Sequence, residues 1–378
     1  MPGEMPEPLR GQGWPAKFGR GAEELEALLL LRCLLGILPR DLFSLAWREG
    51  SAERCVAAIE RGKAGSEGDR AFLRSADPAA IRAEVSACGA RFVAPGDPDY
   101  WPAFLRLADP PAGIFVRGAP LDVGDVCVAV IGSRRPSALG REVATDIAMG
   151  LVRAGAVVVS GGAIGIDAAA HRGALEGAGR TIAVLGSGID VAYPATNRDL
   201  IQRIPVTGTI LSEYAPGVPA EPYRFPARNR LIAALSRGVV VVEGAGRSGT
   251  RITAECATDL GLEVFAVPGP VTSPLAETPL ALIRDGARMV RGADDLLEDL
   301  DLAPMASARA APVGLPLDEQ AAFDALQVAM LPDAVARLAR MPVPETVGAL
   351  IRLELRGLVR GVGGRYERTF GGGPLGEA

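Results

Sequence analysis

The sequence predicts an α/β protein with a parallel sheet at its centre, a helical N-terminal part and a small C-terminal unit. Between residues 126 and 300, apolar runs rich in Val and Ile alternate with helical patterns, which is typical of βαβ units. Before this region, leucines recur at three- and four-residue spacing. After it, three helical patterns precede two short strand patterns separated by a glycine turn, the order of a winged helix-turn-helix.

The charge distribution indicates a focused site for an anion. The 378-residue chain carries a net charge of −5, yet the segment Val128–Thr253 holds 14 arginines against nine acidic residues, a balance of +5. A basic middle between acidic ends favours a polyanionic ligand. Lys17 and Lys63 are the only lysines among 40 basic residues, so phosphate contacts would come from arginine or from backbone amides.

Composition argues against several other classes of protein. The five cysteines form no CxxC pair and the chain has one histidine, so we expect neither a metal nor a cofactor. The N-terminus lacks the apolar segment of a signal peptide. The most apolar run, Ala27–Leu38, is interrupted by Arg32 and is too short to span a bilayer. We therefore expect a soluble, cytoplasmic protein with reduced thiols.

The elements before the sheet are a Pro/Gly-rich mobile tail over residues 1–20 and a helical domain over 21–90, with Asp41 as a candidate N-cap after a break at Leu38-Pro39. A proline-punctuated connector over 92–118 leads into the sheet. Six strands follow: Val126–Ile131, Ala156–Ser160, Thr181–Leu185, Gly208–Leu211, Gly238–Glu243 and Glu263–Val267. In such a sheet the ligand lies beyond the carboxyl ends of the strands.

Two glycine turns stand at these carboxyl ends. The first, GSRRPSALG, offers Gly132, Ser133 and Arg134; it is not GxGxxG, and an ordinary strand-to-helix turn is an equal alternative. The second, SGGAIGIDAAAH, offers Ser160, Gly161, Gly165 and Asp167. His171 shares a helix face with Asp167, and without a Ser or Cys partner a packing or orienting role is favoured over a catalytic one.

Two further segments complete the predicted site. Phe225, Arg228, Asn229 and Arg230 form an arginine loop suited to stacking on bases and holding phosphates of a single strand, with a capped helix start and surface arginines as the alternative. Ser248, Gly249 and Thr250 open another helix and offer hydroxyls and amides to an anion.

The C-terminal part begins after a linker over residues 301–316. Helices are expected at Glu319–Met330, after Pro332-Asp333, and at Glu345–Leu355, followed by a two-stranded wing around Gly363-Gly364. The last helix would be the recognition helix. Its Arg352 and the following Arg356 are balanced by Glu345 and Glu354, so DNA-groove binding and protein docking both stay open.

With these residues in hand, the chain resembles the DNA-processing protein A (DprA/Smf) family. The matching stretches are VAVIGSRRPSALG, SGGAIGIDAAAH, GSGIDVAYPATNRDL, LSEYAPG, FPARNRLIAALS, SGTRITAE, VFAVPGP and LIRDGA. The resemblance implies a Rossmann-like domain over 91–300 between a SAM- or helix-hairpin-helix-like N-terminal domain and a winged-helix domain over 317–378. It also implies a homodimer that is not an enzyme. Such a protein binds and protects incoming single-stranded DNA in natural transformation, counters single-strand-binding protein and helps load the RecA recombinase.

The resemblance also implies roles for single residues. Arg134 would hold a phosphate, amides near Gly132 and Gly161–Gly165 would line the groove, Phe225 would lie against a base and Arg228 would bind the strand. The chain departs from the family at Ile164, where some members carry lysine, at Arg251, and at Leu275–Leu280. A rival reading is a nucleoside-monophosphate phosphoribohydrolase, in which Asp167 or Glu243 would act at a glycosidic bond.

Overall fold

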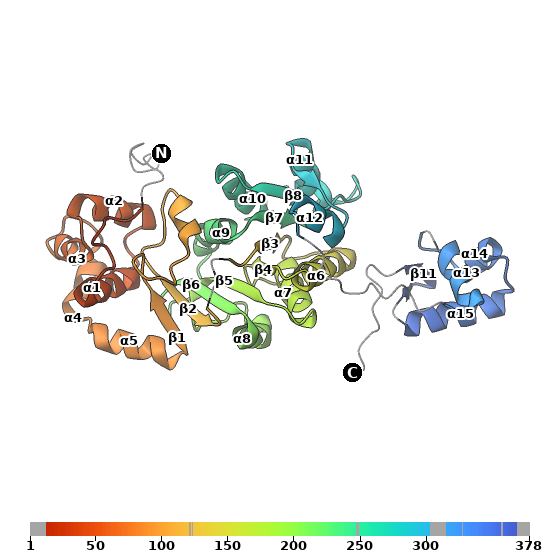
Figure 1. Cartoon of the computed structure of the whole chain (residues 1–378), viewed down its shortest axis with the longest axis horizontal. Helices are drawn as coiled ribbons and strands as arrows, with labels where there is room; N and C mark the ends of the chain where they lie inside the picture. Colours follow the sequence, from red (N-terminus) through yellow and green to blue (C-terminus); the bar gives the residue numbers. More distant parts are fainter. Residues whose placement is uncertain are drawn as a thin grey trace. The chain divides into compact units, whose positions relative to one another are not determined.

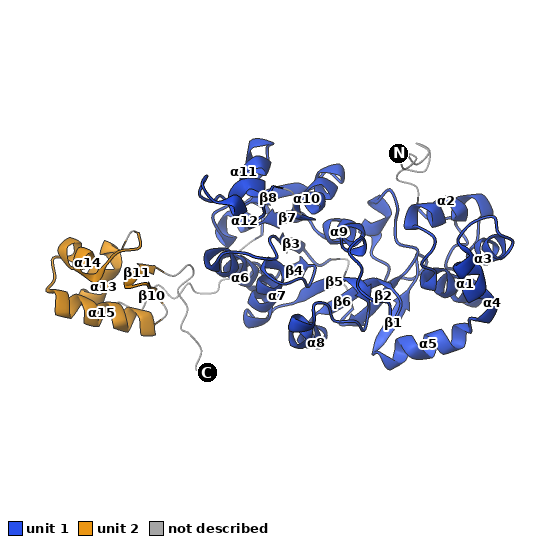
Figure 2. Cartoon of the chain, turned by 180° about the vertical axis from the view of Figure 1, so that it is seen from behind, with its two compact units in different colours: residues 1–303 blue, residues 304–378 orange. Residues whose placement is uncertain are grey.

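The computed structural model describes residues 13–120, 122, 124–246, 249–302, 315–326, 328–356 and 358–368. The chain divides into two compact units, residues 1–303 and residues 304–378 (Figure 2). The predicted tail over 1–20 and linker over 301–316 lie largely outside the described residues. The finer division of the first unit at residue 90 stays a prediction.

The first unit begins with five helices. They are α1 (Ala22–Cys33), α2 (Pro39–Glu49), α3 (Ala52–Glu60), α4 (Glu67–Ser75) and α5 (Pro78–Ala87). The predicted N-cap at Asp41 is wrong, because α2 begins at Pro39, whose fixed φ and missing N–H suit the first helical position. A capping box of Ser66 and Asp69 starts α4. Among the described residues, no helix is long and apolar enough to cross a membrane.

Nine strands of the described chain form one sheet in the order β1-β2-β6-β5-β4-β3-β7-β8-β9, and Figure 1 labels the first eight of this order. The six predicted strands are confirmed as β3 (Cys127–Ile131), β4 (Val157–Ser160), β5 (Thr181–Gly188), β6 (Thr209–Tyr214), β7 (Gly238–Val241) and β8 (Glu263–Ala266). All six are parallel. A short strand, β9 (Arg288–Met289), pairs with β8.

The proline-punctuated connector, residues 92–118, contributes strands to the sheet itself. It contains β2 (Ile114–Gly118) and the end of β1 (Ala90–Val93), and the two strands flank the 3₁₀ turn η2 (Pro102–Arg106). β2 pairs with β6 in antiparallel orientation, so the connector extends the sheet at one edge. The prolines are confined to the segment between these strands, where no ladder hydrogen bond is lost.

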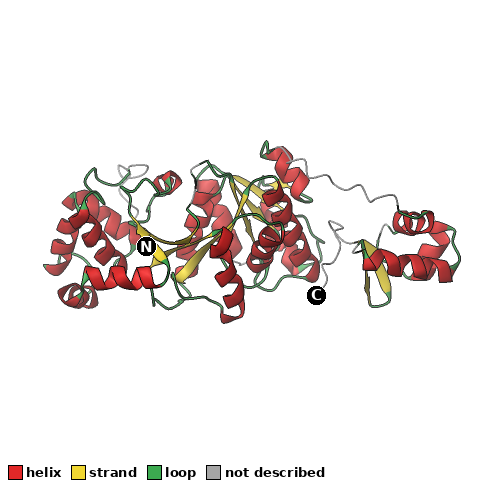
Figure 3. Ribbon diagram, turned by 60° about the horizontal axis from the view of Figure 1, so that its bottom comes forward, coloured by secondary structure: helices red, strands yellow, loops and turns green. Residues whose placement is uncertain are grey.

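Helices cover both faces of the sheet (Figure 3). On one face, α6 (Ala138–Arg153), α7 (Ile166–Glu176) and α12 (Ala293–Asp299) pack on Val128, Val130 and Val158. On the other, α9 (Arg224–Leu235) and α10 (Gly249–Asp259) pack on Val159, Ile182 and Val239. The helices α8 (Arg198–Thr207) and α11 (Glu277–Arg284) complete the unit.

The strand order places the site. From β3 the chain proceeds through β4, β5 and β6 on one side, and then returns to β7 and β8 on the other side of β3. The carboxyl end of β3 is therefore the point where the strand order reverses, which leaves a crevice between neighbouring turns. The first predicted glycine turn leaves β3 here, and the second leaves the neighbouring strand β4 at the same edge of the sheet.

The predicted arginine loop is wrong: these residues form the first turns of α9. Pro226 lies in the first turn, where a helix needs no N–H from that position, so the proline does not prevent the helix. The alternative, a capped helix start with surface arginines, is confirmed in its helix start but wrong in its exposure and side-chain cap, because Arg228 and Arg230 are only 4% and 8% exposed and no side chain caps α9. The helix thus carries its arginines into the protein.

The second unit holds α13 (Leu317–Ala325), α14 (Pro332–Ala339), α15 (Val343–Leu355) and the hairpin of β10 (Val359–Val362) and β11 (Arg365–Arg368). Gly363 and Gly364 both have positive φ, as a two-residue type I′ turn requires. The first helix ends five residues earlier than predicted, because Met330 instead pairs with Tyr366 of the hairpin. The winged-helix assignment stays a prediction.

The arginines of the expected recognition helix are paired within this unit. Arg352 binds Asp318 and Glu319 of α13, with Nε 2.8 Å from Glu319 Oε1. Arg356 Nε lies 3.0 Å from Glu319 Oε2. Both guanidinium charges are therefore balanced by α13 before any ligand arrives.

Candidate nucleic-acid interface

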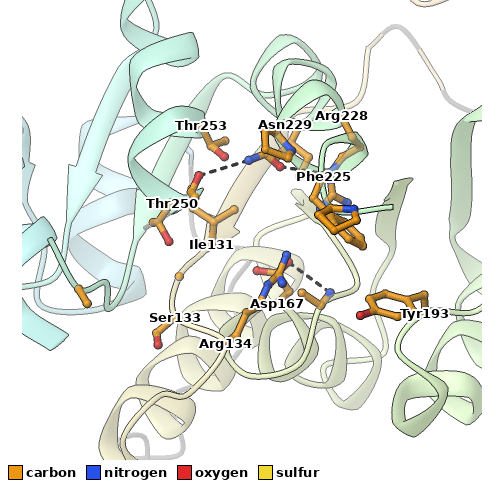
Figure 4. A pocket seen from close by; sticks show the side chains of 17 residues that line it. Ile131, Ser133, Arg134, Asp167, Tyr193, Phe225, Arg228, Asn229, Thr250 and Thr253 are labelled. Atoms are coloured by element: carbon orange, nitrogen blue, oxygen red, sulfur yellow. Dashed lines mark hydrogen bonds between the residues drawn. The ribbon is translucent and has the colours of Figure 1, made fainter. Parts of the chain in front are cut away.

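A pocket of about 500 Å³ opens at the carboxyl end of β3 (Figure 4). It lies between the two glycine turns, the starts of α9 and α10, and the loop before α8. Nine predicted site residues line it, together with Thr253 of α10. The nine are Gly132, Ser133, Arg134, Asp167, Phe225, Arg228, Asn229, Gly249 and Thr250. The four predicted segments thus meet at one cavity, although they are separated by up to about 120 residues in the chain.

Glycine lets the two turns touch. The Ile166 N–H donates to Ser133 O at 3.1 Å, and the Ser133 N–H donates to Glu243 O at 2.7 Å. Gly165 has a φ of +89°, and a Cβ there would lie 2.3 Å from Ser133 O. A side chain at this position would separate the two turns and change the shape of the pocket.

We expect Gly165→Ala to lower the free energy of unfolding by about 2 kcal/mol and to weaken ligand binding, since it adds a backbone clash to an unfavourable φ. Gly155→Ala is the matched control: it has a similar φ of +83° with no atom near its Cβ position. Urea unfolding of both variants measures the difference. Equal destabilisation would mean that the contact between the turns is unimportant.

Arg134 and Phe225 form the mouth of the pocket. The Arg134 guanidinium lies 5.0 Å from the centroid of the Phe225 ring, and the Tyr193 ring lies 5.4 Å from the same centroid. Tyr193 was not predicted as a site residue, because nothing in its local sequence links it to α9. Tyr193 is 47% exposed. A cation and two aromatic rings are therefore presented together to the solvent (Figure 4).

Arg228 lines the pocket but uses its donors internally. It donates to Gly161 O at 2.7 Å and to Val184 O, and its Nε lies 3.2 Å from Asn229 Oδ1. Burial lowers the pKa of Arg228 to about 10, so the side chain stays charged near neutral pH. Arg228 thus ties α9 to the end of β4 and to the middle of β5, and it adds positive potential to the pocket wall.

Arg230 is not brought to the pocket. It forms a buried cluster with Glu213 of β6, at 2.5 Å and 3.0 Å, and with Asp109 of the connector, at 3.0 Å. Arg32 of α1 donates to the backbone carbonyl of Glu213. Burial alone would raise the pKa of Glu213, but Arg230 and Arg32 hold it below its usual value. This cluster anchors the buried side of α9.

The remaining predicted residues support the turns. Ser160 is fully buried and donates to Val130 O at 2.7 Å, and Gly161 lines a smaller cavity beside the pocket. Asn229 Nδ2 donates to Gly249 O at 3.2 Å and so joins α9 to α10. Ser248 lies outside the described residues.

The side chains of His171 and Glu243, the two further candidates for catalysis, form hydrogen bonds within the protein. His171 is fully buried, with Nδ1 2.8 Å from Thr181 Oγ1, and burial together with Arg228 lowers its pKa to about 3. A neutral, buried imidazole is a packing group. Glu243 accepts hydrogen bonds from the Ser137 amide at 2.9 Å and the Ser137 hydroxyl at 2.6 Å, which stabilises the start of α6.

Comparison with known proteins agrees with this architecture. The model of the family described as DNA recombination-mediator protein A matches residues 91–301. The relative named DprA in Mycobacterium tuberculosis (strain H37Rv) is 38% identical over 347 residues, covering 83% of this chain and 88% of its own length.

Two solved structures are also similar. The DNA processing protein A of Streptococcus pneumoniae has a TM-score of 0.55 at 32% identity, covering 70% of this chain and 99% of that one. The DNA processing protein A of Helicobacter pylori, described for its single-stranded DNA binding mode, has a TM-score of 0.51 at 30% identity, covering 57% and 97%. With its site at the switch point of the matched sheet, the chain belongs to the DNA recombination-mediator protein A family.

Proposed function

We propose that this protein binds single-stranded DNA in the pocket at the carboxyl end of β3 and acts as a mediator of recombination. The observation that carries the proposal is the placement of the Arg134 guanidinium over Phe225 at the mouth of a pocket lined by two backbone turns. Aromatic faces take up bases, and guanidinium and backbone N–H groups take up phosphates. The mouth of this pocket offers an aromatic face for a base and donors for a phosphate.

The geometry favours a single strand over a duplex. Phe225 and Tyr193 can stack only with a base whose face is free, and the bases of a duplex are already stacked on one another. The cationic contribution is local: Arg134 is exposed at the pocket mouth, Arg228 adds potential from the wall while its donors are used internally, and Arg230 is neutralised by Glu213. Affinity would therefore combine a few phosphate contacts with stacking.

The descriptions of the relatives support a proposal for the wider role. The family description names recombination mediation, and the H. pylori relative binds single-stranded DNA. We propose that this chain receives single strands during natural transformation, protects them and passes them to the RecA recombinase in competition with single-strand-binding protein. We further propose that it acts as a cytoplasmic homodimer without catalysing a reaction on the DNA.

Equilibrium binding tests the proposal. Fluorescein-labelled dT20 and a 20-base-pair duplex are titrated with the whole protein at several salt concentrations, followed by anisotropy. We expect the single strand to bind at least tenfold more tightly, with an affinity that falls as salt rises. Equal affinity for both DNAs, or none for dT20 at low salt, would refute the proposed function.

Phe225→Leu is expected to weaken dT20 binding about tenfold, because leucine keeps the apolar bulk but loses the face on which a base stacks, worth about 1–3 kcal/mol. The salt slope should stay unchanged, since no charge is removed. Phe72→Leu on α4, in the N-terminal helical cluster, is the control and should bind like the wild type. Unchanged affinity of the Phe225 variant would remove the ring from the site.

A further inference from the structure

Asp167 is an unusual group for a phosphate-binding pocket. The residue lines the cavity and is only 8% exposed, and its Oδ2 accepts a long hydrogen bond of 3.4 Å from the Ala163 N–H (Figure 4). Among the described residues, no cation lies within 4.0 Å of it, although Arg134 and Arg228 line the same pocket. The carboxylate therefore has unused capacity to accept hydrogen bonds.

The neighbouring cations do not fill this capacity. Arg228 directs its guanidinium at Gly161 O, Val184 O and Asn229 Oδ1, and Arg134 packs on Phe225. Burial raises the pKa of Asp167, and the attraction of Arg228 together with hydrogen bonds from the Ala163 N–H and the Ser160 side chain only partly opposes this rise. Lone pairs of a buried carboxylate that stay unfilled are costly, and a ligand that supplies further donors gains the difference.

The chemistry of the strand identifies that ligand. A phosphate would be repelled by the carboxylate, so this part of the pocket suits a base edge that carries N–H groups. Guanine presents N1–H and N2–H side by side, which matches the two oxygens of a carboxylate. Thymine has one N–H between two carbonyls, and adenine and cytosine place a single amino group beside an acceptor nitrogen.

We propose that Asp167 is a specificity-determining residue that accepts the N1–H and N2–H of a guanine whose face lies against Phe225. The pocket then selects guanine at one position of an otherwise sequence-tolerant strand. The inference rests on the proposed function, because it needs a single strand in this pocket. It adds a base preference that stacking and phosphate contacts alone would not produce.

Base analogues in the wild-type protein test this directly. A dT15 strand with one central dG, deoxyinosine, 7-deaza-dG or unmodified dT is used in competition against labelled dT20. We expect the dG and 7-deaza-dG strands to bind about tenfold more tightly than all-dT, because both keep the N1–H and N2–H groups. Deoxyinosine lacks the N2 amino group and should lose most of the gain.

The outcomes separate the two proposals. If all four strands bind within twofold of one another, the role of Asp167 is refuted while single-strand binding stands. If 7-deaza-dG loses the gain, a different edge of guanine is read and the role is likewise refuted. If dT20 itself does not bind, the proposed function fails first.

A variant pair gives the second measurement. Asp167→Asn replaces one acceptor oxygen by a donor, so the ratio of dG-strand to dT-strand affinity should fall from about tenfold to within twofold. Asp146→Asn on α6, a partly buried carboxylate outside the pocket lining, is the control and should keep the ratio. An Asp167→Asn protein that retains the tenfold ratio overturns the proposal. If this variant does not fold, as judged by circular dichroism, the analogue series alone decides.

Discussion

Replacing Arg134 with alanine is expected to weaken dT20 binding by about tenfold to a hundredfold at moderate salt. A hydrogen bond to a charged phosphate contributes about 1.5–3 kcal/mol, and the guanidinium has no carboxylate partner among the described residues that would compensate for its loss. The same change should make the slope of log K against log salt shallower by about one, since one phosphate contact and its released counterion are removed.

The control is Arg203→Ala, which removes an exposed arginine from α8 outside the pocket lining. It should leave both the affinity and the slope near the wild-type values. An Arg134→Ala protein with the wild-type slope would mean that its guanidinium does not contact a phosphate. The assignment of the pocket mouth would then be wrong.

Arg230→Met is expected to lower the free energy of unfolding by about 3–5 kcal/mol, the largest effect on stability that we predict. The substitution leaves Glu213 buried without its ion pair, and removing one partner of such a pair costs far more than the intact pair contributes. Urea unfolding of the two proteins measures this loss. Binding of dT20 by the folded fraction should keep the wild-type salt slope.

The double variant Arg230→Met with Glu213→Leu is the matched control. It removes both charges, so it should recover a substantial part of the lost stability. If instead Arg230→Met unfolds like the wild type and its salt slope is shallower by one, Arg230 contacts the strand. The sequence-based prediction for Arg230 would then hold against the geometry of the buried cluster.

The strands of the sheet can be predicted from the sequence, but the roles of the arginines around the pocket cannot. Runs of Val and Ile identify strands covered on both faces, and glycine turns after them locate the carboxyl edge. The connector was harder to predict, because prolines in the sequence suppress the strand signal of β1 and β2. Pro226 and several arginines give the first turns of α9 the composition of a loop, so the sequence predicts a loop where the helix begins.

Arg134, Arg228 and Arg230 look alike in the sequence, yet the structure gives each a different environment. Arg134 lines the pocket mouth, Arg228 is buried against two carbonyls, and Arg230 pairs with carboxylates 17 and 121 residues away. Such long-range partners leave no local pattern. The same holds for Tyr193, whose contact with Phe225 depends on the packing of two loops.

Photochemical cross-linking tests the central claim most directly, because it reports where the strand lies. A dT20 strand carrying 5-iododeoxyuridine at alternate positions is bound to the whole protein, irradiated and digested, and the cross-linked peptides are identified by mass spectrometry. We predict cross-links at Phe225 or Tyr193, the aromatic side chains at the pocket mouth. Cross-links confined to the C-terminal unit, residues 315–368, with none at the pocket, would contradict the account.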